Sequence, residues 1–205
     1  MSEDVVLRRR ADGATELRVG GVFVMDDVET SSEEILADRA ISCGARDVLV
    51  GGLGLGYTAR ALLASPQVQR VVVGELHRAV VEAVAAGHGA GPLEDPRLQI
   101  VLGDVRDVVA AQRPTSLDAV LLDVDNGPSA LVHESNAGIY ESDALADAVR
   151  VLRPGGTLAI WSMADSPTLR QLMAGFLDDV TADRVPVRLQ QRDEAYWILT
   201  GTRPR

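Results

Sequence analysis

The stretch DVLVGGLGLGYTAR, from Asp47 to Arg60, guides the interpretation of the whole chain. Residues 47–50 have the apolar density of a strand buried on both faces, and residues 57–64 have the apolar spacing of a helix. Four glycines stand between them. Glycines at such a junction let the backbone turn sharply and bring its N–H groups close to a ligand. The stretch predicts a site for a nucleotide-sized ligand, with a plain tight turn as the alternative.

Length and cysteine content set the first limits. The chain has 205 residues, which suits one large domain or a domain with a small appendage. Its one cysteine, Cys43, rules out an internal disulfide framework, so we expect a reducing, cytoplasmic setting and a buried, structural Cys43. No apolar run has the length of a signal-peptide core or a membrane span, so no membrane association is expected.

The net charge of −10 bears on the choice of partner. It argues against nucleic acid, because an acidic surface repels phosphates, and it favours cations such as polyamines, unless it serves solubility alone. The histidines His77, His88 and His133 lack ligand spacing with cysteine or acidic partners, so no metal site is predicted.

Residues 1–45 predict a β-rich appendage and a linking helix. The segments VVLRRR and ELRVGGVFVMDDV are typical of strands, with a bend at Gly20 and Gly21. The segment ETSSEEILADRAI predicts a helix that is capped by one of the residues 30–32.

Residues 46–205 predict an α/β domain with a mostly parallel sheet, because strand-like and helix-like stretches alternate. Strands are expected at 47–50, 70–75, 98–102, 117–124 and 157–163, and helices at 57–64, 78–86, 105–111, 142–152 and 167–177. Two further strands, near 185–190 and 195–201, flank a short polar turn and predict an antiparallel hairpin at one end of the sheet.

Acidic residues follow three successive strands of this domain. Ligands of open parallel sheets bind beyond the carboxyl ends of the strands, where these acids should gather. Glu75 is suited to accept both hydroxyls of a ribose, and Asp104 can accept the amino group of an adenine, although an acid there can also be a helix cap. Asp123 and Asp125 end the next strand.

A dinucleotide is one candidate cofactor, because GLGYTA at 54–59 satisfies the pattern GxGxxG/A and Glu75 has the position of a ribose ligand. A dehydrogenase also needs a substrate domain, and Asp104 has no standard role in it. These two points favour another adenosine cofactor.

The order of VLVGGLGLG, GELH, LGDVRD, LLDVDNGP and LRPGGTLAIW resembles the S-adenosylmethionine-dependent transferases of the Rossmann-like class I methyltransferase fold, and especially the spermidine synthase branch. The resemblance covers nearly the whole chain. It implies that the glycines border the methionine part of the cofactor, Glu75 the ribose and Asp104 the adenine. The cofactor-binding residues so implied are Gly51, Gly52, Gly54, Gly56, Glu75, Leu76, Asp104, Val105 and Asp123.

The same resemblance aligns Asp123 with the catalytic aspartate of the aminopropyltransferases, and Asp125 with the second acid of their DSSDP-like motif. A carboxylate suits this chemistry, since it can orient an amine and accept its proton. Tyr140 is a third catalytic candidate that could close over the site, unless it packs on the sheet. The predicted acceptor-binding residues, some in the long loop SALVHESNAGIY, are Asp125, Asn126, His133 and Glu134.

Three departures from the aminopropyltransferase pattern concern the acceptor and the donor amine. The glycine loop has no aspartate at 53–55, the polyamine-binding tyrosine is replaced by Ser32, and the glutamine after the fifth strand is replaced by Trp161 and Ser162. They bear on polyamine synthesis more than on cofactor binding.

We therefore expect an S-adenosylmethionine-dependent transferase that moves a methyl or related alkyl group to a small cationic or amine acceptor. One alternative is a spermidine synthase-type polyamine aminopropyltransferase that uses decarboxylated S-adenosylmethionine. Another is a non-catalytic protein that binds a nucleoside cofactor. Since members of the family often form dimers, a homodimer is compatible with this interpretation.

Overall fold

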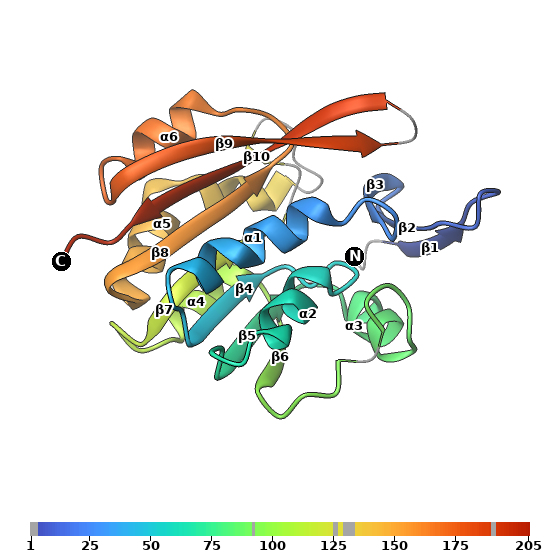
Figure 1. Ribbon diagram of the computed structural model, residues 1–205, viewed down its shortest axis with the longest axis horizontal. Coiled ribbons are helices and arrows are strands. Elements are labelled where there is room, and N and C mark those ends of the chain that lie inside the picture. The colour runs from blue at the N-terminus through green and yellow to red at the C-terminus, as the bar shows by residue number, and fades with distance from the viewer. Residues whose placement is uncertain (1–3, 92, 125–126, 129–133, 190–191) are drawn as a thin grey trace.

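The structure, a computed structural model, describes residues 4–91, 93–124, 127–128, 134–189 and 192–205. A large sheet carries helices on both faces, and a small sheet, formed by the first strands of the chain, lies beside it (Figure 1). The small sheet contains β1 (Val5–Arg9), β2 (Thr15–Val19) and β3 (Val22–Asp26). The large sheet contains β4 (Asp47–Gly51), β5 (Arg70–Glu75), β6 (Leu98–Leu102), β7 (Leu117–Leu122), β8 (Leu152–Ser162), β9 (Asp178–Leu189) and β10 (Arg192–Thr202). The helices are α1 (Ser31–Ser42), α2 (Tyr57–Ala64), α3 (Arg78–Ala85), α4 (Val105–Ala110), α5 (Ser142–Val151), α6 (Pro167–Met173) and the 3-10 helix η1 (Glu134–Tyr140).

The large sheet has the order β6-β5-β4-β7-β8-β10-β9. Strands β4 to β8 pair in parallel, while β10 pairs antiparallel with both β8 and β9. The predicted fold class, a mostly parallel α/β sheet with an antiparallel C-terminal hairpin and a small N-terminal β sheet, is confirmed. Because the order reverses between β4 and β7, the carboxyl ends of these two strands flank a natural crevice.

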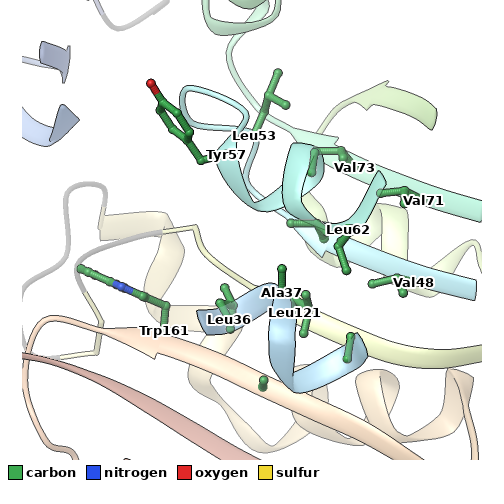
Figure 2. Close-up of a cluster of buried hydrophobic side chains, with 14 of the residues drawn as sticks. Leu36, Ala37, Val48, Leu53, Tyr57, Leu62, Val71, Val73, Leu121 and Trp161 are labelled. Atoms are coloured by element: carbon green, nitrogen blue, oxygen red, sulfur yellow. The ribbon is translucent and has the colours of Figure 1, made fainter. Parts of the chain in front are cut away.

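The central strands are rich in valine and leucine because both of their faces are covered. In β4, Val48 and Val50 belong to one apolar core and Leu49 belongs to the other, as the two-residue period of a strand requires. Helices α1, α2 and α3 contribute to the first core, part of which Figure 2 shows, and α4, α5 and α6 contribute to the second. The sheet is thereby packed on both faces, which holds the ends of its strands in fixed positions.

Helix α1 connects the small sheet to the large one. Leu36, Ala37 and Ala40 on its buried face join the core that contains Val48. The helix thus packs directly on the large sheet, while the domain boundary predicted at residue 45 stays a prediction.

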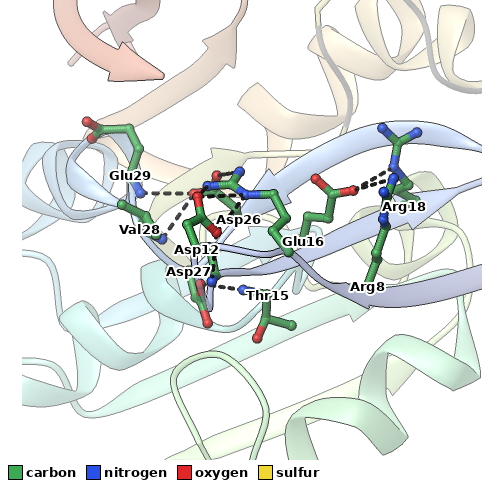
Figure 3. Close-up of polar contacts among 11 residues, drawn as sticks. Arg8, Asp12, Thr15, Glu16, Arg18, Asp26, Asp27, Val28 and Glu29 are labelled. Carbon is green, nitrogen blue, oxygen red and sulfur yellow. Dashed lines mark hydrogen bonds and ion pairs between the residues drawn. The ribbon is translucent and has the colours of Figure 1, made fainter. Parts of the chain in front are cut away.

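A polar network fixes the bend between β3 and α1 (Figure 3). The buried Asp26 accepts the backbone N–H groups of Val28 and Glu29 through Oδ1, at 3.0 Å each, and an arginine N–H of Arg10 through Oδ2 at 2.6 Å. Asp27 accepts the N–H of Thr15 at 2.7 Å. These bonds determine the direction in which α1 begins.

Some local predictions differ from the structure. Cys43 is exposed, so its predicted burial is wrong; it follows the last turn of α1, after the apolar face of the helix has ended. Strand β8 begins at Leu152, before the strand predicted at 157–163, and its register against β7 shifts between Leu117 and Ala119, which accommodates the extra residues as a bulge. The loop expected before α5 contains η1. In the described ranges, no helix combines the length and the apolar character that a membrane span requires.

Candidate active site

The glycine turn after β4 is packed against the end of β7. Gly52, Gly54 and Gly56 all have positive φ angles, of 89°, 51° and 87°. A Cβ atom on Gly52 would lie 2.0 Å from the carbonyl oxygen of Asp123, and one on Gly51 would lie 2.6 Å from a methyl group of Val105. The glycines are therefore required by close approach as well as by the turn itself.

The N-terminal sheet also contacts this turn. The backbone N–H of Leu55 donates to the sulfur of Met25 in β3 at 3.1 Å, and a Cβ on Gly54 would lie 2.7 Å from that sulfur. The appendage thus borders the site.

Glu75, at the end of β5, braces the turn from the other side. It is buried, and its Oε2 accepts the N–H of Leu53 at 2.9 Å while its Oε1 accepts the N–H of His77 at 2.7 Å. Because a carboxylate has about four acceptor directions, Glu75 retains capacity for hydroxyl groups of a ligand. Its predicted ribose contact stays a prediction.

Asp104 is the N-cap of α4. Its Oδ1 accepts the N–H of Arg106 at 2.8 Å, and its Oδ2 accepts a guanidinium N–H of the same residue at 2.6 Å. The side-chain bond to Arg106 holds the pKa of Asp104 below its usual value. The capping role is thus observed, and an adenine amino group would have to compete with Arg106 for this carboxylate.

A pocket opens where β4, β5 and β6 end. It brings together five predicted cofactor residues, namely Gly52, Glu75, Leu76, Asp104 and Val105, with further residues that sequence reasoning did not assign to the site: Gly74, His77, Val124, Asn136 and Ile139. Asn136 and Ile139 come from η1, so the loop before α5 does reach the pocket. Four other predicted cofactor residues, Gly51, Gly54, Gly56 and Asp123, are not among its lining residues.

Asp123 lies directly after β7 and is half-buried. The hydroxyl of Thr58 in α2 donates to its Oδ2 at 3.2 Å. Burial raises the pKa of Asp123 to about 6, against the opposing effect of the Thr58 hydrogen bond.

Glu33, in the first turn of α1, is the second acid of this region. Its side chain is buried, and the Ser32 hydroxyl donates to its Oε2 at 2.7 Å. Burial and the nearby charge of Asp123 raise the pKa of Glu33 to about 8. Sequence reasoning missed it because acids in a first helical turn are common. The spacing of Glu33 from Leu36 and Ala37, three and four residues, places it on the apolar face of the helix and could have predicted its burial.

Aromatic residues surround the same region. Trp161, at the end of β8, packs on Tyr196 of β10 with ring centroids 4.7 Å apart, and Figure 2 shows the indole extending from the strand. Both side chains are buried. The indole N–H of Trp161 is buried and has no hydrogen-bond partner among the described residues.

The remaining predicted residues are Asp125, Asn126, His133, Glu134 and Tyr140. Asp125, Asn126 and His133 lie outside the described residues, as does the side chain of Glu134. Tyr140 is buried in the apolar core behind the site, so a packing role is observed and its catalytic role stays a prediction.

No family model matches the chain. The polyamine aminopropyltransferase of Mycobacterium tuberculosis is 33% identical over 170 residues, which cover 80% of this chain and 31% of that protein. The polyamine aminopropyltransferase of Nitrosomonas europaea is 31% identical over 173 residues, with 79% and 51% covered. Putrescine N-methyltransferase 2 of Nicotiana attenuata is 27% identical over 117 residues, with 55% and 30% covered. The chain thus spans about a third to about half of the length of these relatives.

A crystal structure of spermidine synthase in complex with the transition state analogue AdoDATO has the same fold, with a TM-score of 0.79 and 15% identity over 98% of this chain and 70% of that one. The sheet order and the strand-end crevice define a Rossmann-like protein of the class I methyltransferase type. Within that class, the chain is similar to the spermidine synthase-like branch, in agreement with its motifs.

Proposed function

We propose that the chain transfers an aminopropyl group from decarboxylated S-adenosylmethionine to a small amine. The sequence alone places methyl or related alkyl transfer first, but the aminopropyltransferase relatives favour the alternative. The observation that carries the proposal is the position of Asp123, a half-buried carboxylate whose backbone touches the glycine turn beside the pocket.

The pocket residues fit a nucleoside donor. Gly52 offers a surface without a side chain, Glu75 retains acceptor capacity for ribose hydroxyls, and Asp104 stands where an adenine amino group would compete with Arg106. The donor supplies an electrophilic carbon next to a sulfonium, so that the amine nitrogen bonds to that carbon, the electron pair of the broken C–S bond stays on sulfur, and the amine loses a proton.

Asp123 is the group that we assign to receive this proton. Amines with a pKa of about 10 are mostly protonated in neutral water, so a nearby carboxylate must help to provide the free lone pair. With a pKa of about 6, Asp123 is mainly ionised at neutral pH and still more basic than an ordinary aspartate. Thr58 orients it by donating to Oδ2.

Methyl transfer to an amine is the second candidate. The similarity to putrescine N-methyltransferase 2 favours it, and so does the glycine turn, which has Leu53 and Leu55 but no aspartate to hold the donor amine. Both candidates share the amine acceptor and the role of Asp123.

Turnover with each donor, S-adenosylmethionine and its decarboxylated form, tests the proposal with 1,4-diaminobutane as acceptor. We expect product from the decarboxylated donor, and Asp123→Asn should lower the rate roughly 100- to 10,000-fold while donor affinity is kept. Asp38→Asn, on the exposed face of α1, is the control. Methylated product would favour the second candidate, whereas donor binding without any transfer would identify a non-catalytic binder.

A further inference from the structure

Glu33 is placed on the site by the packing of α1. It lies on the same face of the helix as Leu36, Ala37 and Ala40, which belong to the apolar core. The neighbouring Glu34 points away and is exposed. Two successive glutamates therefore differ in burial, since Glu33 is buried and Glu34 is exposed to solvent.

Among the described residues, the buried Glu33 lies near other acids and forms no ion pair with a cation. The groups whose charges act on Glu33 or respond to it are Asp123, Glu29, Tyr57 and Tyr196. In the described part of the chain, neither Glu33 nor Asp123 is in a salt bridge, and each has a hydroxyl as its hydrogen-bond donor, from Ser32 and from Thr58. A buried and a half-buried carboxylate that lie close together without a cation are costly, and a bound cation relieves that cost.

Aromatic side chains lie next to the acid pair. Burial raises the pKa of Tyr196 to about 12, and the nearby charge of Glu33 contributes to this shift. Trp161 packs on Tyr196. Aromatic faces attract cations, most strongly when the cation is desolvated. The buried indole N–H of Trp161, which has no hydrogen-bond partner among the described residues, independently indicates that a ligand atom accepts a hydrogen bond from it.

We infer that Glu33 is the second carboxylate of the acceptor site, and that with Asp123 it binds the cationic amino group of a small polyamine or other amine beside the Trp161–Tyr196 ring pair. This inference rests on the proposed function and assigns a residue from α1 to it. Asp123 receives the proton of the attacking nitrogen, and Glu33 holds the acceptor. No residue of the predicted acceptor set lies on α1.

The coupling of the two acids gives the inference a readout beyond binding. When both groups interact, their protons leave in two steps that belong to the pair. Removal of the Asp123 charge in Asp123→Asn should lower the pKa of Glu33, because a like charge disfavours ionisation. Because Glu33 ionises near pH 8, diamine binding to the wild type should strengthen as the pH rises through that value, and this dependence should disappear in Glu33→Gln, which a purely structural role of Glu33 would not produce.

The test is calorimetric titration of the wild type, Glu33→Gln and Glu34→Gln at neutral pH with 1,4-diaminobutane and, separately, with 5′-methylthioadenosine as a nucleoside probe. We expect Glu33→Gln to weaken diamine binding roughly 10- to 100-fold, the range for a hydrogen bond to a charged group. Nucleoside affinity should be unchanged in both variants, and Glu34→Gln should bind the diamine as the wild type does.

Wild-type diamine affinity in Glu33→Gln, or equal losses for diamine and nucleoside, would overturn the inference. The proposed function fails separately. If diamine binding depends on Glu33 but no donor supports transfer, the acceptor site stands and the proposed reaction does not. If aminopropyl transfer occurs and Glu33→Gln keeps the wild-type KM and pH profile, the reaction stands and the role of Glu33 does not.

Discussion

The two sides of the site treat their acids differently. On the nucleoside side, Glu75 accepts two backbone N–H groups and Asp104 is held by Arg106, so both carboxylates have built-in partners. On the proposed acceptor side, Glu33 and Asp123 accept hydroxyl groups of Ser32 and Thr58, form no salt bridge among the described residues, and have raised pKa values. The contrast indicates that the first pair shapes a rigid pocket, whereas the second pair is prepared for a charge that arrives with the ligand.

The largest effect should come from the turn that joins the two sides. Gly52→Ala introduces a Cβ only 2.0 Å from the carbonyl oxygen of Asp123, in a backbone with φ of 89°. We expect a loss of at least about 3 kcal/mol in the free energy of unfolding, measured with urea. Gly13→Ala is the matched control, because Gly13 has the same φ of 89° and open space around it. Equal losses in the two variants would show that close approach is not what requires Gly52.

The next effect isolates the nucleoside side. Glu75→Gln replaces one acceptor oxygen by an NH₂ group, so the N–H of Leu53 or of His77 loses its partner. We expect a loss of about 1–3 kcal/mol in unfolding free energy and weaker binding of 5′-methylthioadenosine. Glu94→Gln, at an exposed position, should change neither. Unchanged stability of Glu75→Gln would contradict the assignment of Glu75 as a brace of the turn.

The third effect has the opposite sign and concerns the proposed acceptor side. The pKa of Glu33 is raised from 4.5 to about 8, so the folded state binds more protons than the unfolded state between these values, and stability falls as pH rises through that window. Glu33→Gln should melt like the wild type at about pH 5 and higher than it at about pH 9, by about 2–4 °C for each kcal/mol relieved. Calorimetric melting curves measure the difference, and a variant that melts lower at the alkaline pH contradicts the account.

Sequence reasoning reached the nucleoside side more fully than the acceptor side. The glycine turn and the acids Glu75, Asp104 and Asp123 could be predicted because the carboxyl ends of parallel strands share one edge of a sheet, a consequence of topology. Glu33 could not, because its burial depends on how α1 packs, and that depends on the bend fixed by Asp26.

Other misses have the same origin. The bond from Asp104 to Arg106 requires a side-chain conformation that spacing does not specify. Strand β8 begins before the predicted residue 157 because Arg203, which follows β10, exchanges backbone hydrogen bonds with Gly155 and Gly156. Exposure of Cys43 depends on where the apolar face of α1 ends.

Carboxyl titration of Glu33 and Asp123 by NMR, with and without 1,4-diaminobutane, tests most directly whether the acceptor side is prepared for a cation. The account predicts that Glu33 titrates near 8 in the free protein and that its pKa falls when the diamine binds, since an opposite charge favours the ionised form. An ordinary glutamate pKa in the free protein, or a raised one that the diamine leaves unchanged, would contradict it.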